Sequence, residues 1–386
     1  MSSHVDQLGS VVSVSDEAGT ADGRFTIGVE EEFHVIDPVT RRLTPGAGLI
    51  LARREWDGRV DAELQRSTVE TRTAVCRTLG ELRSQLMGLR HEVIDAAVEV
   101  GRSVVAAGMA PMLDVAEQRI TATARFALMA DDYQIVAREQ LICGCQTHVG
   151  IQDDELAIQI MNRARPWLPA LLALSASSPY WSGADTGYAS YRYEQWRRWP
   201  TSGIPQRYES RAAYAAVVET LIDSGAIADA GMLYWDLRPS DKHGTLEFRI
   251  ADACPTLDDV VLQAALARGI VRTCHQEVMR EQPPPSISWE LLTSASWQAA
   301  RFGLTATLID VQAGRPLPAA DRIRQLLAYV RPALEEEGDW DETLALAEEV
   351  LRRGTSSQRQ REVFARRGRM EDVVDRLIAE TAGDTP

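Results

Sequence analysis

One segment near the start of the chain constrains the fold more than any other. Residues Arg24–Asp37 (RFTIGVEEEFHVID) alternate between apolar and polar side chains, which predicts a β-strand with one face in a core. Glu30 and Glu32 then share the opposite face, about 6.6–6.8 Å apart along the strand. Two carboxylates placed in this way repel each other unless a cation lies between them, which favours Mg²⁺ or Mn²⁺ held by oxygen ligands. A solvated edge strand is the alternative.

Glu31 interrupts this alternation, because it falls on the apolar face of the same strand. Either an arginine pairs with it in the core, or a β-bulge turns it outward. The sequence leaves both arrangements open.

A second polar strand face is expected in Cys143–Gly150 (CGCQTHVG). Gln146 and His148 share one face of this strand, and its glycines permit the close approach of a ligand or of another backbone. A histidine that only forms a structural hydrogen bond is the alternative to a ligand.

A third polar face is expected in Thr245–Ile250 (TLEFRI), where Glu247 and Arg249 lie opposite three apolar residues. An ion pair on the sheet surface would explain this pattern. The functional interpretation is an acid that ligates metal beside an arginine that stabilises a transferred phosphoryl group.

Hydrophobic periodicity predicts a mixture of helices and strands without regular β-α-β-α alternation. An antiparallel sheet with helices packed on one side, the α+β class, fits this order best. Segment Ser178–Arg207 is irregular and rich in aromatic residues, which is typical of a binding loop. After Pro285 the chain is predicted to be helical, with breaks near Gly314, Gly338 and Gly354. The other helices are expected over Thr78–Arg102, Glu155–Ala176, Arg211–Ser224 and Leu257–Glu281, and the other strands over Val69–Val75, Val104–Met109, Ala137–Gln152, Met232–Pro239 and Thr245–Ala251.

Charge and composition exclude several classes of protein. The 386 residues include 41 Lys+Arg and 56 Asp+Glu, a net charge of −15, which argues against a nucleic-acid partner. Lys242 is the only lysine, so a lysine-dependent P-loop is excluded and phosphate must be bound by arginine, backbone amides or metal. The longest apolar stretch, Trp167–Ala176, is too short to span a membrane.

The five cysteines indicate a reducing compartment. They are Cys76, Cys143, Cys145, Cys254 and Cys274, an odd set with no C-x-x-C pair. We therefore expect reduced, packed thiols and a cytoplasmic location. Residues 1–23 are polar and acidic, which is typical of a disordered tail rather than of a signal peptide.

Taken together, six motifs carry a family resemblance that runs from about Arg24 to Thr381. They are GVEEEF, VETRTAVCRTL, CGCxxHVG, DTGYASYR, GMLYWDLR and TLEFR. This set resembles the type 2 glutamate–cysteine ligases, a group of carboxylate–amine ligases in the glutamine-synthetase superfamily. The resemblance implies one catalytic domain over residues 24–386, with a helical C-terminal part and a curved antiparallel sheet that forms a funnel with helices outside.

The same resemblance implies a reaction. ATP would phosphorylate a carboxylate, and an amine would capture the acyl phosphate, with Mg²⁺ or Mn²⁺ bridging the phosphates. The default substrates are the γ-carboxylate of glutamate and the amine of cysteine, and the assembly could be a homodimer. Different acid and amine substrates, as in specialised metabolism, or a non-catalytic binding role are the alternatives; loss of the strand carboxylates would favour the binding role, and here they are present.

The resemblance also assigns roles to individual residues. The metal ligands that it implies are Glu30, Glu32, Glu70, His148 and Glu247, the catalytic residues are Arg249 and Glu30, and the substrate-binding residues are Arg192, Arg238, Gln146, Tyr188 and Trp235. Gln146 departs from the family pattern, which commonly has histidine at this position. Gln146 therefore either shapes an acceptor pocket or indicates an altered preference for metal or amine.

Overall fold

A seven-stranded antiparallel sheet forms the centre of the molecule. The computed structural model describes residues 25–151, 153–240 and 242–384, so the predicted tail, residues 1–23, lies outside the described residues. The strands follow the order β2-β3-β1-β5-β9-β8, and β4 pairs with β1. Their bounds are β1 Ile27–Ile36, β2 Val60–Ala62, β3 Thr68–Arg72, β4 Ser103–Val105, β5 Cys145–Gly150, β8 Leu237–Pro239 and β9 Thr245–Phe248. Every pairing is antiparallel, so the predicted α+β class is confirmed.

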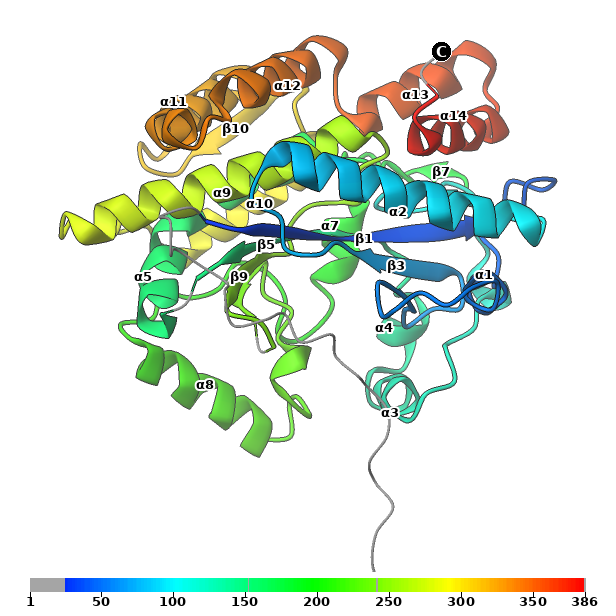
Figure 1. Cartoon of the computed structure of the whole chain (residues 1–386), viewed down its shortest axis with the longest axis horizontal. Coiled ribbons are helices and arrows are strands. Elements are labelled where there is room, and N and C mark those ends of the chain that lie inside the picture. The colour runs from blue at the N-terminus through cyan, green and yellow to red at the C-terminus, as the bar shows by residue number, and fades with distance from the viewer. Residues whose placement is uncertain (1–24, 152, 241, 385–386) are drawn as a thin grey trace, which may run out of the picture.

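Two long helices, α2 and α9, lie along one side of this sheet (Figure 1). Helix α2 (Leu79–Glu99) begins with a capping box of Thr78 and Glu81, and its buried leucines recur every three or four residues, as amphipathic packing requires. Helix α9 (Leu257–Met279) is buried over most of its length.

The remaining elements surround the sheet and the two long helices. The helices are α1 Ala47–Leu51, α3 Ala124–Tyr133, α4 Ile135–Arg138, α5 Asp154–Ala164, α6 Leu168–Ser175, α7 Tyr191–Trp196, α8 Arg211–Asp223, α10 Trp289–Phe302, α11 Ala319–Glu337, α12 Trp340–Arg353, α13 Ser356–Arg367 and α14 Met370–Ala382. Three 3₁₀ turns (η1 Val115–Glu117, η2 Arg165–Trp167, η3 Ala230–Met232) and two hairpins (β6 Tyr180–Trp181 with β7 Ala184–Asp185, β10 Thr307–Asp310 with β11 Arg315–Pro318) complete the fold.

Several predicted elements were wrong in part; the strand predicted over Val104–Met109, for example, ends at Val105 in β4. The strand predicted over Ala137–Gln152 begins only at Cys145. Ala137 and Arg138 belong to α4, where the carbonyl of Ala137 accepts a hydrogen bond from Gln65, and residues 139–144 form a loop with an isolated bridge at Gly144. The strand predicted over Met232–Pro239 is shortened to β8, because the carbonyl of Leu233 accepts from the guanidinium of Arg238 at 2.6 Å instead of from a neighbouring strand.

A further error is in the C-terminal region, which is not helical throughout. Strands β10 and β11 form a hairpin around Gly314, whose φ of 63° is readily adopted by glycine. The carboxylate of Asp310 fixes the turn by accepting from the backbone N–H groups of Gln312 and Ala313, both at 3.1 Å. Four-residue strands are too short for their periodicity to distinguish them from helix.

A buried ion pair joins the central strand to α2. The guanidinium of Arg90 donates to both carboxylate oxygens of Glu31, at 2.6 and 3.2 Å, and the two side chains are 4% and 2% exposed. Arg90 also donates to the carbonyls of Cys254 and Pro255, at 2.8 and 2.7 Å. Of the two arrangements proposed for Glu31, the arginine partner is therefore confirmed.

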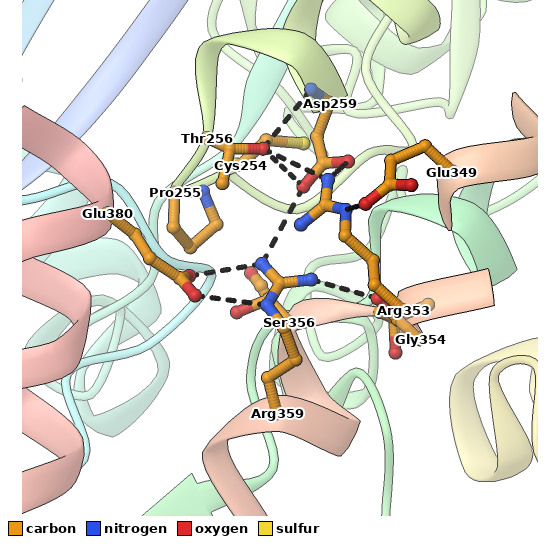
Figure 2. Close-up of polar contacts among 12 residues, drawn as sticks. Cys254, Pro255, Thr256, Asp259, Glu349, Arg353, Gly354, Ser356, Arg359 and Glu380 are labelled. Carbon is orange, nitrogen blue, oxygen red and sulfur yellow. Dashed lines mark hydrogen bonds and ion pairs between the residues drawn. The ribbon is translucent and has the colours of Figure 1, made fainter. Parts of the chain in front are cut away.

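A second polar network attaches the C-terminal helices to the start of α9 (Figure 2). Arg353, at the end of α12, donates to Asp259 at 2.6 Å, and Arg359 of α13 forms a bidentate pair with Glu380 of α14, both contacts at 3.0 Å. Arg90 lies beside this network, since it donates to the carbonyl of Thr381 at 3.4 Å. The C-terminal helices and the central strand thus share one buried arginine.

Within the described ranges, none of the helices is both long enough and apolar enough to cross a membrane. The described cysteines are all buried and free, as predicted.

The Glu31–Arg90 pair generates a stability prediction. In Arg90→Met the carboxylate of Glu31 stays buried without a partner, so we expect the free energy of unfolding to fall by about 3–5 kcal/mol in urea titrations. The double variant Glu31→Leu, Arg90→Met should recover part of this loss, because it leaves no unpaired charge. Arg53→Met, which breaks an exposed pair with Glu99, is the matched control and should cost at most about 1 kcal/mol. An Arg90→Met loss as small as that of the control would contradict the assigned role.

Candidate functional site

The register of the sheet gathers the predicted polar residues on one face. Glu32 of β1 lies opposite Glu70 of β3, and His148 of β5 lies opposite Glu247 of β9. Opposed residues of antiparallel strands point to the same face and come within contact distance. Glu30 lies opposite Gln146, so strand alternation placed these residues on the correct face, except Glu70, which only the family resemblance had assigned.

Two groups of possible metal ligands result. In the first, ligand atoms of Glu30, His148 and Glu247 all lie within 4.8 Å of one another. In the second, the same holds for Glu32, Glu70 and a residue that the sequence analysis missed, Glu63. We call these groups the histidine cluster and the carboxylate cluster.

Glu63 escaped the sequence analysis because it lies in the short link between β2 and β3. Its only signal was that Asp61 and Glu63 are two residues apart, as two side chains on one strand face would be. Strand β2 has three residues, too few for a periodic pattern to indicate which face is buried.

The negative charges of the carboxylate cluster are only partly compensated, because Arg72 contacts Glu70 and the pKa of that carboxyl is nevertheless raised. Burial, followed by the charges of Glu30 and Glu63, raises the pKa of Glu70 well above its usual value. Burial and the charge of Glu63 raise the pKa of Glu32 to about 7, and burial likewise raises the pKa of Glu63. A divalent cation would stabilise the ionised forms of all three, and three carboxylates are a donor set that suits Mg²⁺ or Mn²⁺.

The negative charge of Glu247 in the histidine cluster is compensated by neighbouring arginines. Burial acts to raise the pKa of Glu247, but the charges of Arg249 and Arg238 outweigh it and hold this pKa well below its usual value. Burial also acts to lower the pKa of His148, and its interaction with Glu30 reverses that shift and raises the pKa. Glu247 is therefore ionised at neutral pH and able to act as a ligand.

The orientation of His148 suits a ligand. Its Nδ1 lies 2.9 Å from the hydroxyl of Thr245, which fixes the ring. Its Nε2 is buried without a hydrogen-bond partner and lies 3.7 Å from a carboxylate oxygen of Glu30. An unpartnered imidazole nitrogen among carboxylates fits a metal better than a purely structural histidine.

Arginines occupy the remaining space around the carboxylates. Arg249 contacts Glu247, and Arg238 contacts the other oxygen of the same carboxylate at 3.0 Å. Arg72 contacts Glu70 and lies 3.4 Å from Glu30. The Nε of Arg249 is buried and has no hydrogen-bond partner, so it remains available to an oxygen of a ligand.

Gln146 lies between the two clusters. Its amide nitrogen donates to Glu32 at 3.1 Å, and its amide oxygen accepts from Arg249 at 2.5 Å. The second oxygen of Glu32 accepts from the backbone N–H of Gly144 at 2.7 Å. Gln146 therefore faces the site and orients one candidate ligand and one arginine.

The predicted substrate-binding residues are only partly brought together. Arg238 lies at the site, whereas Arg192 of α7 donates to the carbonyls of Ile250 and Arg249, both at 3.2 Å. Gly144 permits this approach, because a Cβ there would lie 2.6 Å from the Arg192 guanidinium.

The two aromatic residues assigned to substrate binding have their contacts elsewhere. The ring of Trp235 packs against Tyr208 and Tyr214, and the hydroxyl of Tyr188 accepts from Trp297. Their roles in substrate binding stay predictions.

Trp196 is a further residue that the sequence analysis did not identify. The guanidinium carbons of Arg192 and Arg249 lie 5.8 and 5.4 Å from its ring centroid. These are cation–π distances, so this ring helps to hold both arginines in place.

Comparison with known proteins gives a consistent family assignment. A family model described as glutamate-cysteine ligase family 2 matches residues 26–376. A Frankia alni protein, provisionally named glutamate–cysteine ligase 2-3, is 47% identical over 93% of this chain and 42% of its own length. A Mycolicibacterium smegmatis protein, provisionally named glutamate–cysteine ligase 2-2, is 45% identical over 92% of this chain and 90% of its own length. The chain thus spans less than half of the Frankia protein.

Solved structures share the fold at low sequence identity. A glutamate–cysteine ligase from Francisella tularensis in complex with AMP has a TM-score of 0.69 and 11% identity, covering 93% of this chain and 89% of its own. A bifunctional glutathione synthetase from Pasteurella multocida also has a TM-score of 0.69, with 15% identity, covering 93% of this chain and 52% of its own.

The two clusters predict two metal sites that can be lost separately. We expect Mn²⁺ titrations followed by electron paramagnetic resonance to detect two bound ions. Glu63→Gln should weaken one of them by about tenfold or more, and Glu247→Gln should weaken the other. Glu92→Gln, at a surface carboxylate paired with Arg59, is the control and should change neither. Full binding of both ions by Glu63→Gln would remove Glu63 from the ligand set.

The contacts of Gln146 predict that it acts on metal affinity. Gln146→Leu removes the hydrogen bond that orients Glu32, so Mn²⁺ affinity at the carboxylate cluster should fall by about 10–100-fold. The control is Thr147→Val, a change of similar volume at the adjacent, buried residue on the opposite face of β5. Unchanged Mn²⁺ affinity together with an altered preference among acceptor amines would instead place Gln146 in an acceptor pocket.

Proposed function

Since the chain belongs to glutamate–cysteine ligase family 2, we propose that it is an ATP- and Mg²⁺-dependent carboxylate–amine ligase. The observation that carries this proposal is the pair of clusters on one sheet face, bordered by Arg249, Arg238 and Arg72. Carboxylates that hold divalent cations beside arginines are what phosphoryl transfer requires when no P-loop lysine is present.

In the proposed reaction, an oxygen of the acid substrate attacks the γ-phosphorus of ATP and ADP leaves. The amine then attacks the acyl carbon and phosphate leaves, forming the amide. Bound Mg²⁺ would neutralise the phosphate oxygens during the first step. Glu30, Glu32, Glu63, Glu70, His148 and Glu247 would hold these ions.

The arginines have separate proposed roles. The unpartnered Nε of Arg249 would donate to an oxygen of the transferred phosphoryl group, and Glu247 and Gln146 hold its guanidinium in position. Arg238, held by Glu247, would bind the carboxylate of the acid substrate. Arg192 is placed behind Arg249, where it supports the backbone of that residue.

The names of the relatives support glutamate and cysteine as the acid and amine substrates. The AMP bound to the Francisella structure supports an adenine nucleotide as the phosphoryl donor. Gln146, which replaces the common family histidine, supports a second candidate, the same chemistry on a different acid or amine. The five free, buried cysteines support a cytoplasmic location.

The products of the reaction test this proposal. We expect ADP and phosphate, and positional isotope exchange within ATP that requires the acid but proceeds without the amine. A panel of acids and amines, with glutamate and cysteine as the reference pair, would identify the substrates. Release of AMP and pyrophosphate would contradict the acyl-phosphate route.

Arg249→Met should lower the exchange rate by about 10²–10³-fold, because one donor to the transition state is lost. Arg280→Met, at an exposed arginine after α9, is the control and should react normally.

A further inference from the structure

A cavity that shares no residue with the clusters lies near the C-terminal ends of α5 and α9, two helices that contact each other. Its volume is about 220 Å³, and its walls include Arg163, Trp167, Glu277 and Tyr329. No member of the two clusters contributes to it. Its volume is below that of a typical drug-binding pocket, so it admits only a small molecule.

Arg163 offers a fixed donor to this cavity. The residue is 5% exposed, and its two terminal nitrogens donate to the backbone carbonyls of Gln159 and Gln282. Its Nε is buried and has no hydrogen-bond partner. Because its terminal nitrogens are held by these carbonyls, the guanidinium is fixed in place and contributes its positive charge to the cavity wall.

Glu277 offers an opposing acceptor. One of its carboxylate oxygens accepts from the hydroxyl of Tyr329 at 3.0 Å. Burial raises the pKa of Glu277, and the nearby charge of Arg163 opposes this shift. Among the ion pairs of the described residues there is none between Arg163 and Glu277, and both side chains line the cavity.

The remaining wall combines aromatic and proline side chains with two amides, those of Gln282 and Gln312. Trp167 and Tyr329 stack with centroids 4.7 Å apart, and Arg322 covers Trp167 at 4.3 Å from its ring centroid. Two prolines, Pro283 and Pro285, also line the cavity. Such walls accept an uncharged side chain, whereas the two charged groups require complementary charges on the ligand.

We propose that this cavity binds a free amino acid as a zwitterion, with its carboxylate at Arg163 and its ammonium group at Glu277. One small molecule that carries both charges satisfies the two groups at once. The site does not include any group used in the proposed ligase reaction, so the inference holds or fails independently of that function.

Isothermal titration of the full chain with L-methionine, L-glutamine, L-alanine and glycine tests the proposal. At least one should bind at millimolar concentration with a stoichiometry of one. For L-methionine, N-acetyl-L-methionine lacks the ammonium group and L-methioninamide lacks the carboxylate, so both should bind at least tenfold more weakly. Absence of binding by all four amino acids, or binding of either blocked analogue as tight as that of L-methionine, would overturn the proposal.

Variants locate the bound molecule. Arg163→Lys and Glu277→Gln should each weaken binding at least tenfold, whereas Arg366→Gln, at an exposed arginine of α13, should not. Glu277→Gln can keep the contact with Tyr329, so it remains a fair test if Arg163→Lys fails to fold. Glu247→Gln should leave this binding unchanged. Binding that is lost in Glu247→Gln and kept in Glu277→Gln would assign the amino acid to the sheet face and refute the second site.

Discussion

The ion pair between Glu31 and Arg90 determines what the sheet presents on its other face. Successive side chains of a strand point in opposite directions, so a slip of one residue would exchange every group on the two faces of β1. With Glu31 paired to Arg90 in the core, Glu30 and Glu32 must point to the opposite face. An unpaired carboxylate in the core would cost several kcal/mol, so this pair specifies the register as well as contributing to packing.

The clusters place many like charges close together, and the structure balances them unequally. Glu247 lies between Arg249 and Arg238 and remains ionised, whereas Glu70 and Glu32 have raised pKa values because burial and neighbouring carboxylates disfavour their charged forms. The carboxylate cluster therefore depends more on a bound cation to stay ionised than the histidine cluster does. As the pH falls toward these raised pKa values, a metal ion that binds at the carboxylate cluster must displace protons from Glu32 and Glu70. Metal affinity at this cluster should therefore vary with pH more than metal affinity at the histidine cluster.

Much of the site could be predicted because each strand carries its own pattern. Alternation alone placed Gln146 and His148 on one face, and the hydrophobic periodicity of α2 located that helix to within a few residues. Partners across the fold could not be predicted in this way. Arg90 is 59 residues from Glu31, and Glu63 joins its cluster only through the pairing of β2 with β3. Such contacts depend on tertiary packing, which local periodicity does not encode.

Gln146 illustrates what a single departure from a family pattern can change. Its amide donates to Glu32 and accepts from Arg249 at the same time, and it does so without titrating. A neutral imidazole could also donate with one nitrogen and accept with the other, but a protonated imidazole can only donate. Histidine here would therefore lose its acceptor toward Arg249 on protonation, while adding positive charge beside Glu32. Glutamine keeps the connection between the two clusters at every pH at which the fold survives, and it gives up any proton transfer that a histidine at this position could perform.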